Sequence, residues 1–384
     1  MDKVFNSTCR FCEGELRQPA LLSYSGSPQS AQGFLDSLDQ IDDVVDLKIF
    51  QCSFCGLVQH CLPPVSYFRD VIRAVAYSKE MANFREEQLS KWILNNKLFN
   101  KNIIEIGSGR GEYLELLIRC GAKQLSGLEN SIESVDFAQS KGLDVRRGYL
   151  SPGFSTPWSN LFDAFTIFSF MEHWPDLRGS LFELRKLLNE GAVGLIEVPN
   201  FDFVLSNGLY SEFTPDHIFY FDKNNLRTVI ELCGFEVIEI SSVWHNYILS
   251  AQVKKRVALS IDGFTQKQVR IVNELNTFLE KFKREEVVVW GAGHQALAVM
   301  SVSKITNKIS HVVDSATFKQ QKYTPGTKLL IKNPASLLKD KPIAIVVMAA
   351  AYSDEVYSTI KTNYPSIKHI ALLREDHLEI SAFG

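Results

Sequence analysis

Two Cys-x-x-Cys pairs stand near the start of the 384-residue chain, and thiols at this spacing can bind a metal ion. The first pair is Cys9 and Cys12, and the second is Cys52 and Cys55, followed by Gly56. Each tight turn directs two sulfurs toward one point, so the two pairs can supply four thiolates to a tetrahedral site. The total of seven cysteines is odd, which argues against a disulfide framework. We therefore expect one structural zinc ion held by the four paired cysteines.

The three remaining cysteines have other expected roles. Cys61, beside His60, is the substitute ligand if one of the four does not bind metal. Cys120 and Cys233 lie near the ends of predicted helices and are expected to be small core residues. Two alternatives to zinc stay open, namely that one pair holds reduced thiols without metal or that the pairs carry out redox chemistry.

A glycine-rich loop follows the first apolar strand of the central region. It places Glu105 before Gly107, Gly109 and Gly111, with Ser108 between the first two glycines. Glycines at alternate positions between a strand and a helix let the backbone approach a ligand closely. A dinucleotide pyrophosphate favours G-x-G-x-x-G, whereas an acid at the strand end favours a cationic ligand. These features point to S-adenosylmethionine, with Glu105 anchoring its amino-acid end.

A second acid, Glu129, stands at the end of the next predicted strand. A carboxylate there can accept hydrogen bonds from both ribose hydroxyls, as acids do in dinucleotide-binding folds. Asn130, beside it, and Ser169, after the fourth predicted strand, complete the expected cofactor-binding residues. The alternative is an α/β protein whose glycine turn binds nothing and whose glutamate lies on the surface by chance.

Strands and helices are predicted to alternate along the central region. The expected strands are 101–106, 125–128, 143–146, 162–168 and 192–198, and the expected helices are 112–119, 132–141 and 177–188. A helix over 79–98 precedes them and one over 225–233 follows, while 235–243 and 247–253 can pair as an antiparallel hairpin. Alternation of this kind specifies a parallel sheet covered by helices on both faces.

The last third of the chain contains a second alternating region. Its first strand, 287–290, leads into Gly291 and Gly293, with Ala296 at the third position of a dinucleotide fingerprint and Asp314 further on. Further strands are expected over 309–313, 343–348 and 368–372, and a polar amphipathic helix over 265–283 is expected to be a connector. Because a GxGxxA motif alone is weak, this turn either binds the nucleotide part of a substrate or is only structural.

Composition and these elements together predict three domains and exclude several classes of protein. We expect a zinc-binding domain over 1–65, a central α/β domain over 66–255 and a C-terminal Rossmann-like α/β domain over 256–384. With 41 Lys and Arg against 44 Asp and Glu, the chain has no basic excess for binding nucleic acid. It has no apolar run of about 18 residues and no signal-peptide core at its start. We therefore expect a cytoplasmic protein without nucleic-acid or membrane partners, as a monomer or homodimer.

The central region resembles the class I S-adenosylmethionine-dependent methyltransferases. The resemblance spans residues 103–243 and includes the glycine loop, the segments 168–174 and 182–188, and the strand 192–198. It implies a Rossmann-like fold for residues 66–255 and a methyltransferase activity that uses the predicted cofactor.

The flanking regions are similar to those of the zinc-containing deoxysugar C-methyltransferases. The similar features are the two cysteine pairs, Ser27-Pro28 and Phe34 between them, and the segments 313–315 and 322–327 near the end. Because the three parts occur in the family's order, the resemblance covers nearly the whole chain. It implies a structural role for zinc and methylation of a carbon atom of a nucleotide-linked keto-deoxysugar.

The resemblance also points to residues for the acceptor. Where the family has a Tyr-Asp-Glu-His-type run and an aromatic pair, this chain has Thr214-Pro215-Asp216-His217 followed by Tyr220 and its neighbours. His217 keeps the family's histidine, and an imidazole with an ordinary pKa of about 6.5 suits a general base. Asp216 would orient this imidazole or bind the substrate, and Tyr220 would contact the substrate or simply be a core aromatic.

Two more residues are candidates for the chemistry. Tyr77 matches a family tyrosine that faces the substrate, and His173 follows the fourth strand, where open sheets place ligand-facing groups. Either could stabilise a developing oxyanion, and His173 is the alternative base. Each of these residues also has a purely structural interpretation. Tyr77 would then be a packing residue and His173 a loop histidine. The same holds for His217, which would then simply pack over the sheet edge.

Departures from the family at positions 214 and 216 leave the acceptor open. An O- or N-methyltransferase, or a C-methyltransferase for another glycosyl or polyketide-like ketone, fits the same cofactor site. An NAD-dependent oxidoreductase that uses the Gly291 turn is an alternative of a different class. A zinc-ribbon interaction or nucleic-acid module is a third, against which the lack of a basic patch around residues 9–61 counts.

Overall fold

The structure, a computed structural model, describes residues 8–32, 34, 35, 37, 39, 44–69 and 78–382. The chain forms two compact units, Met1–Ala258 and Leu259–Gly384, which we describe one at a time. Within the described ranges, no helix combines the length and the apolar character needed to cross a membrane. The predicted boundary at residue 65 falls inside the first unit, so the three-domain division stays a prediction.

The first unit is built around a seven-stranded sheet with the order β10-β11-β8-β7-β4-β5-β6. Its strands are β4 Asn102–Ile106, β5 Gln124–Glu129, β6 Val145–Arg147, β7 Phe162–Phe168, β8 Leu188–Pro199, β10 Phe235–Val243 and β11 Ile248–Lys255. Strands β4 to β8 pair in parallel, whereas β11 runs antiparallel to both β8 and β10. The parallel α/β arrangement and the terminal hairpin predicted from the sequence are both confirmed.

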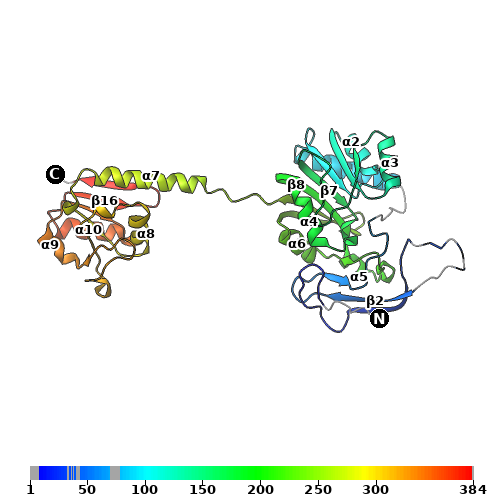
Figure 1. The fold of residues 1–384 in the computed structure, drawn as a ribbon, viewed down its shortest axis with the longest axis horizontal. Helices are drawn as coiled ribbons and strands as arrows, with labels where there is room; N and C mark the ends of the chain where they lie inside the picture. The colour runs from blue at the N-terminus through cyan, green and yellow to red at the C-terminus, as the bar shows by residue number, and fades with distance from the viewer. Residues whose placement is uncertain are drawn as a thin grey trace. The chain divides into compact units, whose positions relative to one another are not determined.

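Helices cover both faces of this sheet (Figure 1). One face carries α1 Lys79–Asn95, α2 Glu112–Arg119 and α3 Ile132–Ser140, and the other carries α4 Leu177–Lys186 and α6 Lys223–Leu232. Successive residues of a strand point to opposite faces. Accordingly, Ile103 of β4 packs in the core under α1 to α3, whereas Ile104 and Ile106 pack in the core under α4 and α6.

A smaller four-stranded sheet, β1-β2-β3-β9, contains the N-terminal cysteine region. Its strands are β1 Leu22–Pro28, β2 Val44–Gln51, β3 Val58–His60 and β9 Phe219–Tyr220. Strand β9 comes from the segment between β8 and α6, and it pairs antiparallel with β3. Strand β2 also packs against α5 Phe201–Ser206 (Figure 1). The N-terminal region therefore shares a sheet with the segment that contains His217, a contact between distant parts of the chain that the sequence pattern did not indicate.

The second unit has a six-stranded sheet with the order β14-β13-β12-β15-β16-β17. Its elements are α7 Asp262–Leu279, β12 Val287–Trp290, α8 His294–Val302, β13 His311–Val313, β14 Ile331–Lys332, α9 Leu337–Asp340, β15 Ala344–Val347, α10 Ser353–Asn363, β16 His369–Leu373 and β17 Leu378–Ala382. Its strands pair in parallel except for the antiparallel pair of β16 and β17.

Helix α7 corrects one expectation for the second unit. The polar helix predicted over 265–283 was expected to be a connector, but its end packs into the core of this unit through Leu275, Phe278 and Leu279. Glu274 also accepts a hydrogen bond from the backbone N–H of Leu378 at 2.7 Å. The apolar residues of its last turns are thus part of the fold and not of a linker.

Candidate functional site

The strand order of the first unit reverses between β4 and β7. From β4 the chain continues to β5 and β6 on one side, whereas β7 leads to β8 on the other. Open α/β sheets bind ligands outside the carboxyl ends of the strands at such a point. The glycine loop follows β4, and Ser169 and Phe170 follow β7, so both loops lie at this edge.

The glycine loop has a backbone shape that only glycine adopts easily. Gly107, Gly109 and Gly111 have φ values of +72°, +56° and +86°. A Cβ atom at Gly107 would lie 2.5 Å from the ring of Phe170, and one at Gly111 would lie 2.3 Å from the side chain of Leu143. The loop therefore approaches its neighbours closely at Gly107 and Gly111, whereas a Cβ atom at Gly109 would lie at an ordinary distance of 3.4 Å from Oε2 of Glu112.

Glu129, at the end of β5, is fixed by the backbone of two loops. Its Oε2 accepts a hydrogen bond from the N–H of Gly109 at 2.9 Å, and its Oε1 accepts from Asn130 and Ser131 at 2.8 and 2.9 Å. A small cavity beside this carboxylate is lined by Ile106, Gly107, Leu128, Glu129, Asn130, Gly148, Tyr149, Leu150 and Phe170. A carboxylate held in one orientation inside a cavity fits the two hydroxyl donors of a ribose.

The other four residues expected to bind the cofactor differ in their burial and in their contacts. Glu105 is fully buried in β4 beneath the loop. Ser108 is also buried, but its side chain packs against Gly127 of β5, where an added Cβ would lie 2.5 Å from the serine oxygen. Ser169 is exposed, has a φ of +47°, and donates its N–H to the carbonyl of Glu197 at 2.9 Å. Asn130 lines the cavity with Glu129, whereas the side chain of Ser108 serves packing.

Aromatic side chains that we did not predict form a wall of this cavity. The ring of Phe170 lies edge-on to Tyr149, with centroids 6.3 Å apart, and edge-on to Trp174 at 5.8 Å. Phe68 contacts Tyr149 in the same way at 5.6 Å, and the guanidinium of Arg69 lies 5.5 Å from the Tyr149 ring. Burial raises the pKa of Tyr149. Flat apolar walls of this kind suit a planar ligand group such as adenine.

A buried ion pair ties α1 to the sheet next to the switch point. Arg85 pairs with Glu197 of β8, and their side chains are 2% and 0% exposed. Gln88 donates to Glu197 at 2.5 Å and to the hydroxyl of Ser250 at 3.2 Å, and the guanidinium of Arg85 lies 4.9 Å from the ring of Phe168. Removing one partner of such a pair leaves an uncompensated buried charge, so this contact holds α1 firmly in place. The sequence did not indicate this ion pair, because Arg85 and Glu197 are far apart in the chain.

His217 is presented by a hydrogen-bonded turn. The N–H of His217 donates to the carbonyl of Thr214 at 3.3 Å, which places Pro215 and Asp216 at the two central positions. Proline suits the first central position because its φ is already fixed near the required value. The hydroxyl of Tyr220 donates to the same Thr214 carbonyl at 3.3 Å, and burial raises the pKa of this tyrosine.

The carboxylate of Asp216 does not orient the imidazole of His217, as we had expected it could. Its Oδ2 accepts the N–H of Ala31 at 2.7 Å, and its Oδ1 accepts the hydroxyl of Tyr67. Burial, reinforced by this carboxylate, raises the pKa of Tyr67. Asp216 is itself buried, so its side chain connects the turn to the N-terminal region instead of facing a substrate.

Two imidazoles and a carboxylate meet beside the turn. The rings of His173 and His217 have centroids 4.9 Å apart, and each offers a nitrogen within 4.8 Å of the other and of an oxygen of Glu172. Burial lowers the pKa of His173 to about 3 and that of His217 to about 4. Both rings are therefore neutral at neutral pH and carry a lone pair that can accept a proton. Glu172 was not singled out from the sequence.

A second small cavity lies beside His217. Its lining consists of Pro199, Phe201, Val204, Glu212, His217, Phe219 and Tyr220. The carboxylate of Glu212 accepts a hydrogen bond from the hydroxyl of Tyr247 at 2.6 Å. Tyr220 is both a core aromatic, packed on Phe201 and Phe213, and part of this lining. The remaining acceptor candidate, Tyr77, lies outside the described residues.

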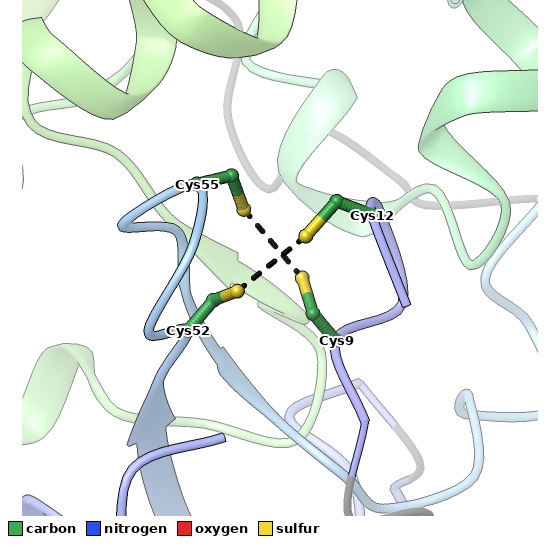
Figure 2. Close-up of side chains that lie close together, drawn as sticks. All are labelled: Cys9, Cys12, Cys52 and Cys55. Atoms are coloured by element: carbon green, nitrogen blue, oxygen red, sulfur yellow. Dashed lines mark hydrogen bonds between the residues drawn. The ribbon is translucent and has the colours of Figure 1, made fainter. Parts of the chain in front are cut away.

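The four paired cysteines converge on one point (Figure 2). The sulfurs of Cys9 and Cys55 lie 3.7 Å apart, those of Cys12 and Cys52 lie 3.5 Å apart, and all four lie within 4.8 Å of one another. Tetrahedral zinc with bonds of about 2.3 Å places its sulfurs about 3.8 Å apart. The hydrogen bond from Cys55 lowers the pKa of Cys9 to about 5, while the same hydrogen bond and burial raise the pKa of Cys55. The cluster is therefore compatible with zinc.

The other cysteines differ in their surroundings. None of the seven, all of which are described, forms a disulfide. Cys61 is not part of the four-sulfur cluster, and both ring nitrogens of His60 make hydrogen bonds to backbone groups. Cys233 is fully buried in the core, as expected, whereas Cys120 is partly exposed and contacts the carbonyl of Glu86.

The second glycine turn has a packing explanation. Gly291 has a φ of +118°, and a Cβ there would lie 2.4 Å from the carbonyl oxygen of Met348 after β15. Asp314 accepts the N–H groups of Ala292 and Ala316 at 2.7 and 2.9 Å. The close approach of two backbones therefore requires this glycine whether or not a nucleotide binds.

Comparison with known proteins gives two family matches on this chain. Residues 80–240 match the family described as a methyltransferase domain, and residues 253–366 match the C-methyltransferase C-terminal domain. No curated protein matches the chain.

Solved structures similar to this chain include three methyltransferases. An S-adenosylmethionine-dependent methyltransferase from Clostridium acetobutylicum is 16% identical, with 49% of this chain and 96% of that chain covered and a TM-score of 0.38. One from Aquifex aeolicus is 16% identical over 47% and 94% of the two chains, with a TM-score of 0.38. Magnesium protoporphyrin IX methyltransferase from Synechocystis, with bound SAH, is 11% identical over 47% of this chain and 89% of that chain, with a TM-score of 0.37.

The two family matches agree with the glycine loop and with Glu129, whose carboxylate is held by backbone N–H groups. Together they identify an S-adenosylmethionine-dependent methyltransferase that carries the C-terminal domain of the C-methyltransferases.

Proposed function

We propose that this methyltransferase methylates a carbon atom of a small nucleotide-linked keto-deoxysugar. The observation that carries the proposal is the match of residues 253–366 to the C-methyltransferase C-terminal domain. Carbon methylation requires a base. His217 can serve as one, because its ring is neutral at neutral pH, and it lies 4.9 Å from the ring of His173, which follows β7. The sugar is suggested by the resemblance of the flanking regions to the deoxysugar family.

Residues of the glycine loop and β5 would hold the methyl donor. S-Adenosylmethionine supplies, when bound, a methyl group on a sulfonium that is already a good leaving group. Gly109 allows the backbone to approach it, and Glu129 accepts hydrogen bonds from the ribose hydroxyls. Glu105, buried beneath the loop, would accept a hydrogen bond from the amino group at the donor's amino-acid end.

Replacing Glu129 by alanine is expected to weaken S-adenosylhomocysteine binding by about 1–3 kcal/mol, because the ribose hydroxyls lose their acceptor. The same change frees the N–H of Gly109, which now donates to Glu129 at 2.9 Å. Isothermal titration calorimetry would measure the affinity, with exposed Glu133→Ala of α3 as the control. An unchanged affinity for Glu129→Ala would refute this ribose contact.

The chain's own task at the acceptor is to make a carbon nucleophilic. We assign His217 to remove the proton next to the ketone, so that the electron pair of the C–H bond passes into an enolate. The enolate carbon then bonds to the methyl group as the sulfonium bond breaks, and His217 keeps the proton. His173 donates Nδ1–H to the carbonyl of Asp216 at 2.8 Å, so its Nε2 carries a lone pair. It is therefore the alternative base and not an oxyanion donor, a role that Tyr77 could take.

We also propose that the four-cysteine cluster binds one zinc ion with a structural role. Four thiolates give a closed site, since no position remains for a substrate or water. The ion would fix the two cysteine turns at the base of the small sheet.

The function is tested with a panel of nucleotide-linked sugars and isotopically labelled S-adenosylmethionine. Mass spectrometry is expected to find the label in one keto-deoxysugar. Incubation of that sugar with the enzyme in D2O is expected to exchange the hydrogen next to the ketone. Label on oxygen or nitrogen would overturn carbon methylation. If NADH raised the melting temperature and S-adenosylhomocysteine did not, the assignment of S-adenosylmethionine as the cofactor would be wrong.

A further inference from the structure

His60 is a buried polar residue of the N-terminal region that the proposed chemistry does not use. It ends β3 and is fully buried. Its Nδ1 accepts the N–H of Leu62 at 3.1 Å, and its Nε2 lies 3.0 Å from the carbonyl oxygen of Pro215. Because Nδ1 accepts, the proton is on Nε2, which donates to Pro215. Burial lowers the pKa of His60 to about 4, so this tautomer persists at neutral pH.

The acceptor of this hydrogen bond is a central carbonyl of the turn that presents His217. The next carbonyl, that of Asp216, accepts a hydrogen bond from His173 at 2.8 Å. The two central carbonyl groups of the turn are thus held from two separate parts of the unit, β3 and the 3-10 turn Met171–His173 that follows β7. Because the carbonyls of Pro215 and Asp216 are both held, the backbone of the turn has little freedom to move. The position of the next residue, His217, is therefore fixed as well.

The backbone repeats the same connection. The N–H of His60 donates to the carbonyl of Ile218 at 3.2 Å, and the N–H of Ile218 donates to the carbonyl of Glu172 at 2.9 Å. Strand β3 then pairs with β9, which follows directly after this segment. These backbone hydrogen bonds are sufficient to hold Ile218 and β9 in the small sheet. The side chain of His60 is not needed for that pairing, and its hydrogen bond to Pro215 constrains the turn in addition.

We propose that His60 is a positioning residue for His217, so that the N-terminal cysteine region forms part of the acceptor site. The inference rests on the proposed role of His217 as the base. The imidazole must face the reacting C–H bond, and a displacement of about 1 Å can cost about 10²-fold in rate. His60 limits that displacement through Pro215, without contacting the substrate itself.

The test compares His60→Leu with His60→Gln. Leucine leaves the Pro215 carbonyl buried without its donor, and kcat is expected to fall by about 10²-fold. Glutamine can again donate a side-chain N–H to this carbonyl, so it is expected to recover most of the lost turnover. Metal content and S-adenosylhomocysteine affinity are expected to stay unchanged in both variants. The NMR signals of the His217 ring are expected to shift in the leucine variant and return in the glutamine variant.

Controls separate positioning from general destabilisation and from an error in the proposed base. His311→Leu removes a histidine that is also buried but lies in the second unit, and it is expected to keep its turnover. Full turnover in His60→Leu, failure of glutamine to restore it, or loss of metal in step with turnover would each overturn the proposal. Normal turnover in His217→Asn would overturn the proposed base and this inference with it. A dead His217→Asn with a fully active His60→Leu would overturn the inference alone.

Discussion

His217→Asn is expected to lower turnover by a factor of about 10²–10⁴ while S-adenosylhomocysteine affinity stays unchanged. Asparagine keeps a polar side chain of similar reach but cannot accept the proton that must leave the acceptor carbon. Because the pKa of His217 is lowered to about 4, the imidazole carries its lone pair throughout the neutral range. Turnover of the unaltered enzyme is therefore expected to rise with pH through about 4 and to show no further dependence on this group.

Single-turnover mass spectrometry and calorimetry would measure the two quantities separately. His245→Asn is the matched control, since this histidine is 70% exposed and pairs with Glu80 on the surface. Near-normal turnover in His217→Asn would move the base to His173, whose lone pair is on Nε2. If His173→Asn were also active, the reaction would need no histidine base.

Cys52→Ser is expected to lose the metal and much of the stability of the first unit together. Formation of such a site is coupled to folding, and the binding of structural zinc contributes about 10–16 kcal/mol in zinc-finger peptides. Cys52 is fully buried next to Leu57, and its loss opens the cluster at the start of the turn that leads into β3. Because β3 pairs with β9, turnover is expected to fall as well.

Elemental analysis of freshly purified protein and thermal unfolding would check this result. Cys61→Ser is the control, because Cys61 is partly exposed, follows β3 and lies outside the four-sulfur cluster. The control is expected to keep one zinc per chain. Absence of zinc in the unaltered protein, or full zinc content in Cys52→Ser, would end the zinc assignment.

Local patterns in the sequence were enough to predict most of the elements of the proposed cofactor site. The helix 112–119 and the strands 162–168 and 235–243 have the bounds that we expected. Apolar runs bounded by glycine or polar residues specify strands, and a 3.6-residue period specifies helices, whatever the rest of the chain does. Within each cysteine pair the tight turn alone brings the two sulfurs together, whereas the meeting of the two pairs depends on the tertiary structure.

The acceptor side could not be predicted in this way. His60 and Pro215 are 155 residues apart, and Tyr67 and Asp216 are 149 residues apart, yet both pairs are hydrogen-bonded. The two-residue strand β9 is too short to have a period, and it exists only because β3 offers its edge. Such contacts depend on how the small sheet packs, which no local pattern encodes.

The sequence by itself determined the alternating fold, the glycine loop and its acid, and the turn of each cysteine pair, because these depend on local period and spacing. Only the tertiary structure decided which partner each buried polar side chain takes. Asp216 illustrates the difference, since its place beside His217 suggested an orienting carboxylate, whereas the folded chain gives both its oxygens to Ala31 and Tyr67. A buried polar group bonds to whichever donors packing brings near it, and here packing brought those of the N-terminal region.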